Sequence, residues 1–332
     1  MTSNGPLPQS ATGPQDPGPS VMPVFDAASP QAAEIQSVFF TVLVLCAVIF
    51  ALVAVLIVIA MLRFRARKGV EPRQDFGSEK AEIAWIIGPT LVVGWLVAIT
   101  IKLVLAISAM PEARPDGSEP ADLVVTGHQW WWEVEHVATG IVEANEIYIP
   151  VGKKLLVHVR SADVAHSFWV PRLARKIDAI PGIDNYVWLE ASEPGVYRGW
   201  CAEFCGAQHA GMRFRVYALP QDEYEQWQAS RQQVPQDPQD ADAQAGKRLF
   251  FQMTCANCHA IEGTDAVMTI GPDLTHFAER KTIGAGAIDN SPENLARWLE
   301  DPQAIKPGCK MPNFHLTPEQ IRLFVAYLET LR

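Results

Sequence analysis

The sequence has few basic residues. Its 332 residues include 27 lysines and arginines against 37 aspartates and glutamates, which gives a formal net charge of -10. A surface that follows nucleic-acid phosphates needs clustered lysine and arginine, so this balance argues against a nucleic-acid-binding protein. An acidic surface can instead attract a basic protein partner. The sequence has no visible internal repeat, and its length favours two or three domains.

Lysine and arginine are missing altogether from residues 1–34, which are rich in proline, glycine, serine, glutamine and alanine. This segment lacks the basic start of a signal peptide, and we predict a disordered leader outside the cytoplasm. Charge of either sign is absent from residues 38–62, a run long enough to cross the ~30 Å hydrocarbon core. A second apolar block follows at residues 83–109. We predict transmembrane helices over residues 35–64 and 82–109.

The loop between these helices, residues 65–81, is basic, whereas the leader is not. The positive-inside rule therefore places the loop in the cytoplasm and both termini on the other side of the membrane. The expected location is the bacterial cell (inner) membrane, with two spans in the lipid bilayer. The basic residues of this region are Arg63, Arg65, Arg67, Lys68, Arg73 and Lys80.

The rest of the chain divides into two soluble domains. Residues 120–220 contain short alternating apolar segments between proline and glycine turns, which predicts a compact β-sandwich or barrel. Residues 221–241 are polar and rich in glutamine, aspartate and proline, and we predict a helix followed by a flexible linker. Residues 242–332 contain two helical stretches, each opened by Ser or Thr followed by Pro, so this domain is predicted to be mostly α-helical.

Four of the six cysteines lie in two close pairs that are also rich in histidine, a pattern of metal or haem sites rather than of disulfides. The first pair begins a twelve-residue stretch with two thiols, an imidazole and a thioether, and a further histidine lies upstream. Soft sulfur and imidazole ligands select copper or zinc, but methionine is a poor zinc ligand. Five ligands are too many for one tetrahedral ion and suit two metals bridged by both sulfurs. They are His166, Cys201, Cys205, His209 and Met212.

Residues 35–220 resemble subunit II of cytochrome c oxidases. The resemblance rests on residues 127–132 (GHQWWW), 166–168 (HSF), 176–182 (KIDAIPG) and 201–212 (CAEFCGAQHAGM). It implies a cupredoxin-like β-barrel with a binuclear copper (CuA) centre. In that centre Cys201 and Cys205 would bridge two coppers, His166 and His209 would each ligate one, and Met212 with the backbone carbonyl of Glu203 would complete the ligand set.

The same resemblance implies three further roles. The Glu203 carboxylate would reach a magnesium ion at the boundary with the catalytic subunit, although a solvent-facing loop acid is the simpler interpretation. Trp130 would be the residue through which electrons enter. Glu82 would lie at the mouth of a proton path, but an acid at a helix N-terminus is also ordinary.

Because neighbours on a strand face opposite ways, residues 130–132 cannot all be core, and at least one tryptophan should be exposed or at an interface.

The second cysteine pair, Cys255-Ala-Asn-Cys258-His259, has the signature of covalent c-type haem attachment. A redox or zinc fragment is less favoured, because no second cysteine pair follows. The segment around Gly271-Pro272 resembles the cytochrome c loop whose proline supports the proximal histidine. The distal ligand is predicted to be Met311, in competition with Met268, His276 and His315. Cys309 is expected to be structural.

Together these features predict a multidomain membrane protein: a two-helix transmembrane hairpin, a cupredoxin-like β-barrel and an all-α cytochrome c domain. It would pass electrons from a cytochrome c or an upstream respiratory complex, through haem c and copper, to oxidase subunit I, with subunit III as a further partner. Three alternatives stay open: a nitrous oxide reductase, a quinol oxidase subunit, and a membrane-anchored copper carrier or redox sensor. The first would need a propeller domain, and the second would lack the copper ligands.

Overall fold

This computed structural model describes residues 24–65, 68–69, 71, 77–108 and 117–332. The chain divides into two compact units, one over Gln31–Ser108 and one formed by the remaining residues. The first 23 residues of the predicted leader lie outside the described residues, as does about half of the predicted cytoplasmic loop, including Arg67 and Arg73.

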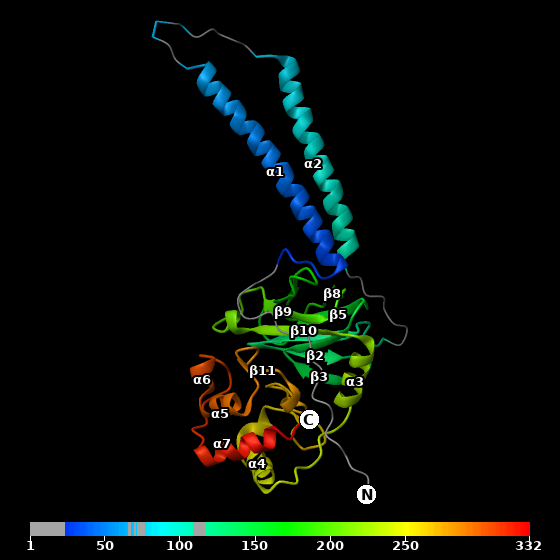
Figure 1. Ribbon diagram of the computed structural model, residues 1–332, viewed down its shortest axis with the longest axis vertical. Coiled ribbons are helices and arrows are strands. Elements are labelled where there is room, and N and C mark those ends of the chain that lie inside the picture. Colours follow the sequence, from blue (N-terminus) through cyan, green and yellow to red (C-terminus); the bar gives the residue numbers. More distant parts are fainter. Residues whose placement is uncertain (1–23, 66–67, 70, 72–76, 109–116) are drawn as a thin grey trace. The chain divides into compact units, whose positions relative to one another are not determined.

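Two long helices, α1 (Pro30–Arg63) and α2 (Glu79–Ile107), form the first unit and run in opposite directions (Figure 1). Both are long and apolar enough to cross a membrane. The predicted pair of spans is therefore confirmed, with α1 starting five residues earlier and α2 three residues earlier than the predicted spans. Pro89 is accommodated inside α2, which is ordinary for helices in a membrane.

Ten strands build the β-sandwich, residues 121–219, as two five-stranded sheets. One sheet has the order β3-β2-β1-β5-β8 and the other β4-β10-β9-β6-β7. This confirms the predicted cupredoxin-like fold. The strands are β1 (Leu123–His128), β2 (Trp131–His136), β3 (Ile141–Ala144), β4 (Glu146–Pro150), β5 (Leu155–Ser161), β6 (His166–Trp169), β7 (Ile177–Ala179), β8 (Asn185–Leu189), β9 (Gly195–Cys201) and β10 (Arg213–Leu219).

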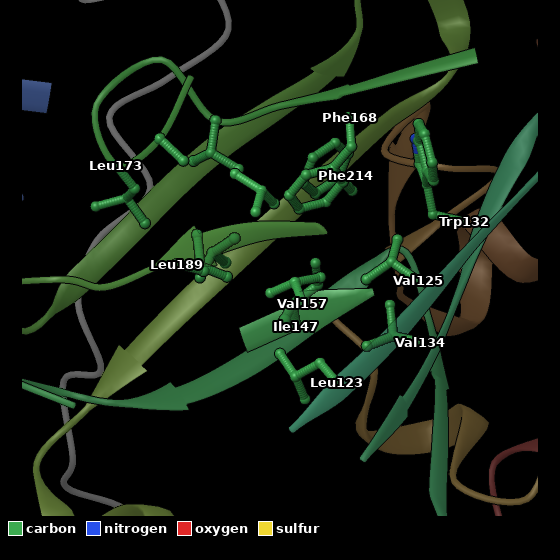
Figure 2. Packing of buried hydrophobic residues seen from close by; sticks show 14 of the residues in the cluster. Leu123, Val125, Trp132, Val134, Ile147, Val157, Phe168, Leu173, Leu189 and Phe214 are labelled. Carbon is green, nitrogen blue, oxygen red and sulfur yellow. The ribbon is translucent and has the colours of Figure 1, made fainter. Parts of the chain in front are cut away.

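The core of the β-sandwich lies between the two sheets, where apolar side chains from both converge (Figure 2). At one end of this core the rings of Phe168 and Phe214 stack at 4.6 Å, and Trp132 meets both edge-on at 5.7 Å. Trp132 also contacts the imidazole of His166 at 5.8 Å. A Cβ at Gly127 would lie 2.8 Å from this imidazole, so the glycine lets the histidine pack against the backbone of β1. The aromatic cluster thus fixes a predicted ligand.

The last residues of the predicted disordered leader are ordered against the β-sandwich. Ala28 and Ser29 are both buried. The Ala28 N–H donates to the Arg172 carbonyl at 2.9 Å, and the Ser29 hydroxyl donates to the Leu173 carbonyl. The prediction of disorder therefore does not hold for these residues, because backbone hydrogen bonds replace those to water.

The C-terminal domain, residues 241–332, packs its helices around one small core. Gly246 lets α4 and α7 approach closely, since a Cβ there would lie 2.0 Å from the Leu323 carbonyl. Ser291 and Thr317 cap α5 and α7, as the Ser-Pro and Thr-Pro pairs predict. The elements are α4 (Ala241–Gln252), η2 (Thr254–Asn257), η3 (Phe277–Glu279), β11 (Thr282–Ile283), β12 (Ile288–Asp289), α5 (Pro292–Glu300), α6 (Pro302–Ile305) and α7 (Pro318–Leu328).

Buried charges join the C-terminal domain to the β-sandwich. The connecting helix α3 (Gln221–Arg231) ends at Arg231, whose Nε donates to Glu143 on β3 at 2.7 Å and whose guanidinium also pairs with Glu279. The Glu146 carboxylate on β4 accepts the backbone N–H groups of Lys281 and Thr282 at 2.7 and 3.0 Å. Breaking one such buried pair costs about 3–5 kcal/mol. The two domains are therefore docked, whereas the linker composition had suggested a loose tether.

Candidate metal centre and cofactor cavity

The structure brings together all the side chains predicted to bind copper. His166 is the first residue of β6 and Cys201 the last of β9, and these neighbouring strands pair in the register Phe168 to Cys201. The loop after β9 carries Cys205, and the short helix η1 (His209–Gly211) carries His209. Met212 directly follows η1 and is fully buried. One end of the second sheet therefore holds all five ligands.

The two sulfurs lie at the middle of this cluster. Cys201 Sγ and Cys205 Sγ are 3.8 Å apart, too far for a disulfide. His166 Nδ1 lies 3.9 Å from Cys201 Sγ, and His209 Nδ1 lies 3.7 Å from Cys205 Sγ. Met212 Sδ is 3.8 Å from Cys205 Sγ. Each sulfur therefore has one imidazole nitrogen close to it, which is the arrangement that two bridged metals require.

The backbone carbonyl of Glu203, the sixth predicted ligand, lies 3.2 Å from Cys201 Sγ. The Glu203 side chain is exposed. The carbonyl thus lies next to a predicted bridging sulfur, and the carboxylate points to no partner within the part of the chain that the structure describes. Glu82 lies in the first turn of α2, in the other unit, and belongs to neither site.

Two buried thiols side by side bind protons strongly. Burial, and after it the neighbouring Cys201, raises the pKa of Cys205 to about 12. They can both be thiolates only where cations neutralise them, as in a metal site. The donor set is soft, buried and larger than one tetrahedral ion needs, so these residues fit a pair of copper ions better than one zinc.

A carboxylate that the sequence analysis missed holds His166. Asp163 Oδ1 accepts a hydrogen bond from His166 Nε2 at 2.8 Å, which leaves Nδ1 facing Cys201. Burial raises the pKa of Asp163, but its hydrogen bonds to His166 and to the backbone N–H groups of Gln129 and Val164 outweigh this and lower it. An ionised carboxylate therefore fixes the imidazole as a neutral ligand. The only sequence signal was an acid three residues before a candidate ligand.

Replacing Asp163 with Asn should weaken copper binding about 10- to 100-fold, because the histidine loses its carboxylate while the ligands stay. Copper titration of the metal-depleted protein measures this. Asp184→Asn is the matched control: Asp184 accepts a hydrogen bond from His158 Nε2 at 2.9 Å, but His158 is not among the ligands. Equal copper affinity in both variants would contradict the role of Asp163.

The C-terminal domain and the β-sandwich together enclose a cavity of about 820 Å³, counting its open mouth. Both predicted axial ligands, His259 and Met311, line it. Apolar side chains of the C-terminal domain make up much of the remaining wall: Ile270, Leu274, Phe277, Ile283 and Trp298. This is the apolar, two-ligand environment that a haem requires.

The loop at Gly271-Pro272 orients His259 as predicted. The Pro272 carbonyl can only accept, so His259 Nδ1 donates to it, at 2.7 Å, and Nε2 is left as the ligand atom. Burial lowers the pKa of His259, which keeps the imidazole neutral. A Cβ at position 271 would lie 2.6 Å from the ring, so only glycine permits this approach.

Among the candidate distal ligands, only Met311 lines the cavity. Its sulfur accepts a hydrogen bond from Trp298 Nε1 at 3.2 Å, a contact that the sequence did not indicate. Met268 and His315 are exposed, and His276 is buried with its Nε2 against the Arg231 carbonyl. Cys309 lies at the cavity wall, with the Gln303 amide donating to its sulfur at 3.3 Å.

The two cysteines of the haem signature precede His259 on and after η2; Cys255 is half-buried and Cys258 exposed. Burial raises the pKa of Cys255 to about 11.

Trp130 lies between the two sites. Its indole N–H donates to the carbonyl of Cys205 at 3.0 Å, and the residue lines the cavity that His259 and Met311 also line. Trp132 is core, while Trp131 is buried in a small cluster with Ala144 and with Ala285 of the C-terminal domain. Two of the three tryptophans thus meet the other domain, in agreement with the expectation that one would lie at an interface.

Known proteins share this domain order. Residues 17–103 match the family "Cytochrome C oxidase subunit II, transmembrane domain", residues 138–219 match its periplasmic domain, and residues 243–332 match "Cytochrome c". Cytochrome c oxidase subunit 2 of Alkalihalophilus pseudofirmus is 35% identical, over 95% of this chain and 92% of its own length. The chain belongs to the cytochrome c oxidase subunit II family.

A second relative agrees. The subunit 2 of Bacillus sp. (strain PS3) is 34% identical over 81% of this chain and 80% of its own length. The solved periplasmic domain of subunit II of cytochrome oxidase of Bradyrhizobium japonicum is 32% identical, covering 34% of this chain and 95% of that chain with a TM-score of 0.32.

Membership of this family establishes the coarse function. The chain is a membrane subunit of cytochrome c oxidase, and its partner is subunit I of that enzyme. The family implies copper in the β-sandwich, where His166, Cys201 and Cys205 meet, and the cytochrome c domain implies haem. The nitrous oxide reductase and quinol oxidase alternatives find no support in these matches.

Proposed function

We propose that this chain takes electrons from a donor protein and passes them, through covalent haem c and a CuA centre, to subunit I, which reduces O2 to water with proton pumping. The observation that carries the proposal is the position of Trp130, which lines the haem cavity and bonds to Cys205. A single residue thus borders both cofactor sites of one chain.

The side chains divide the work as follows. Cys255 and Cys258 would attach the haem, with His259 and Met311 as its axial ligands. Cys201 and Cys205 would bridge the coppers, with His166, His209, Met212 and the Glu203 carbonyl as the remaining ligands. When bound, the haem and the copper pair supply carriers that each accept and release one electron. The protein contributes fixed ligands and a buried, rigid setting, so that little rearranges on reduction.

We also propose a domain organisation and a membrane orientation for this chain. A leader, residues 1–34, would precede two spans, residues 35–64 and 82–109, joined by a loop at residues 65–81. A copper domain at residues 120–220 would follow, and a connection at residues 221–241 would join it to a haem domain at residues 242–332. The termini and soluble domains would face outward from a bacterial inner membrane, beside subunits I and III. The exposed Glu203 carboxylate would reach a magnesium ion at the subunit I boundary, and Glu82 would begin a proton path.

Electrons would reach Trp130 from the haem of the same chain, because Trp130 lines that cavity. A cytochrome c or an upstream complex would then dock on the haem domain rather than at Trp130. This differs from an oxidase whose donor docks directly on the copper domain. A membrane-anchored copper carrier would not need a haem cavity facing its copper site.

Replacing Trp130 with Phe should slow electron transfer from haem to copper by roughly tenfold or more, because the bond to the Cys205 carbonyl is lost and the contact between the sites is shifted. Flash photoreduction of the haem in the purified oxidase, followed by absorbance of both centres, measures the rate. Trp188→Phe is the control, since Trp188 lies on β8 and does not line the cavity. The proposal fails for Trp130 if both variants transfer at the wild-type rate.

A further inference from the structure

One buried lysine, Lys306, hydrogen-bonds to three backbone segments near the predicted haem and copper sites. Lys306 follows α6 and is only 5% exposed. Its ammonium lies 2.8 Å from the Trp130 carbonyl, 3.0 Å from the Gly211 carbonyl and 2.9 Å from the Gly284 carbonyl. A lysine ammonium has three N–H donors, so every donor has an acceptor.

The three acceptors belong to different parts of the molecule. Trp130 precedes β2 and faces the haem cavity, and Gly211 immediately precedes the predicted copper ligand Met212. Gly284 directly follows β11 and belongs to the C-terminal domain. Lys306, which directly follows α6, belongs to the same domain. One side chain therefore connects both the tryptophan and the copper loop to the haem domain.

Lys306 differs from an ordinary charged surface residue. No carboxylate lies within ion-pair distance of it among the described residues, so its partners are backbone dipoles with fixed positions. Burying an ammonium is costly unless it is fully hydrogen-bonded. Burial lowers its pKa to about 8, which still leaves the ammonium as the main form at neutral pH. Such a residue is suited to fixing a backbone geometry.

We propose that Lys306 is a positioning residue for electron transfer between the haem and copper sites, holding Trp130 and the loop before Met212 against the haem domain. This rests on the proposed function. Two neighbouring contacts support the same docking. The Gln208 amide donates to the Pro307 carbonyl at 2.6 Å. Gly308 lies close to Ala207, since a Cβ added at position 308 would be 3.5 Å from the Ala207 Cβ. Lys306 also lines the haem cavity, but its three donors all bond to backbone carbonyls, so it would act through the groups it holds.

The test uses Lys306→Met in the complete oxidase, a change that keeps the length of the side chain and removes its donors. The expected result has three parts. The haem spectrum and the copper paramagnetic-resonance signal stay as in the wild type. Amide hydrogen exchange becomes faster in the peptides containing Trp130 and Gly284. Haem-to-copper transfer after flash photoreduction slows by roughly ten- to a hundredfold, the range expected when a reacting pair is misplaced by about 1 Å.

Lys247→Met is the matched control. Lys247 lies on α4 of the same domain and pairs with Asp237 at the surface. The proposal would be overturned if amide hydrogen exchange in Lys306→Met were as slow as in the wild type and in the control. It would also be overturned if haem-to-copper electron transfer slowed without faster amide exchange. Should Lys306→Met fail to load its cofactors, Lys306→Gln replaces it. Its shorter amide cannot reach all three carbonyls, and wild-type exchange at Trp130 in that variant would equally overturn the proposal.

The exchange measurement also separates this proposal from the proposed function. If the wild-type oxidase showed no haem-to-copper transfer, the proposed function would fail. Faster exchange in Lys306→Met would then still show that Lys306 docks the domains, although its role in electron transfer would be lost.

Discussion

Replacing Cys205 with Ser removes both copper ions as a functional pair and reduces oxygen consumption by the assembled oxidase to background. Cys205 is the centre of the cluster: its sulfur lies within 3.8 Å of Cys201 Sγ, His209 Nδ1 and Met212 Sδ. A serine hydroxyl is a hard, weakly acidic ligand that cannot replace a bridging thiolate. Copper analysis and paramagnetic resonance measure the loss, and the haem spectrum should not change because the haem ligands belong to another domain.

Cys46→Ser is the control for this substitution. Cys46 lies in α1, in the unit that does not contain the cluster, and should retain full copper and activity. A Cys205→Ser protein that kept the signal of an electron shared over two copper nuclei would rule out the bridging role. Zinc in place of copper in the wild-type protein would rule out the centre itself.

Replacing Met311 with Leu leaves the haem attached but changes its iron coordination. The two cysteines and His259 remain, whereas the thioether that accepts the Trp298 N–H is lost. Because methionine ligation raises the haem potential, the potential should fall by on the order of 0.1 V, part of the ~0.8 V range that axial ligands span. The haem would then be reduced poorly by its donor, and oxygen consumption should fall strongly. Redox titration and the optical spectrum measure the change.

Met268→Leu is the matched control, since Met268 is exposed and does not line the cavity. Its spectrum and potential should equal those of the wild type. An unchanged low-spin spectrum in Met311→Leu would remove Met311 as the distal ligand. A shift in Met268→Leu instead would reassign that role.

The sequence predicted those features that depend on neighbouring residues. The spans follow from uninterrupted apolar runs, and the capped helices α5 and α7 from Ser-Pro and Thr-Pro pairs. Four of the copper ligands lie within twelve residues of the sequence, so this motif could be recognised without knowing the surrounding fold. His259 is likewise adjacent to its cysteines, and the proline that orients it lies 13 residues away.

Contacts between distant segments could not be predicted in this way. The bonds from Lys281 and Thr282 to Glu146 join residues 135 and 136 positions apart, and the bond from Lys306 to Trp130 spans 176 positions. In a sequence, Lys306 looks like any surface lysine, and a linker of glutamine, aspartate and proline gives no sign that the domains beyond it are docked. Only the fold shows that these charges are buried, and burial turns them into a fixed interface.

The central claim is that electrons pass from the haem of this chain to its own copper centre. Flash photoreduction of the haem in the purified wild-type oxidase tests it most directly, with haem and copper absorbance followed together and no soluble cytochrome c added. The account predicts that haem oxidation and copper reduction proceed at one common rate, independent of protein concentration. A haem that stays reduced while copper is reduced only by added soluble donor, at a rate that rises with donor concentration, would contradict it.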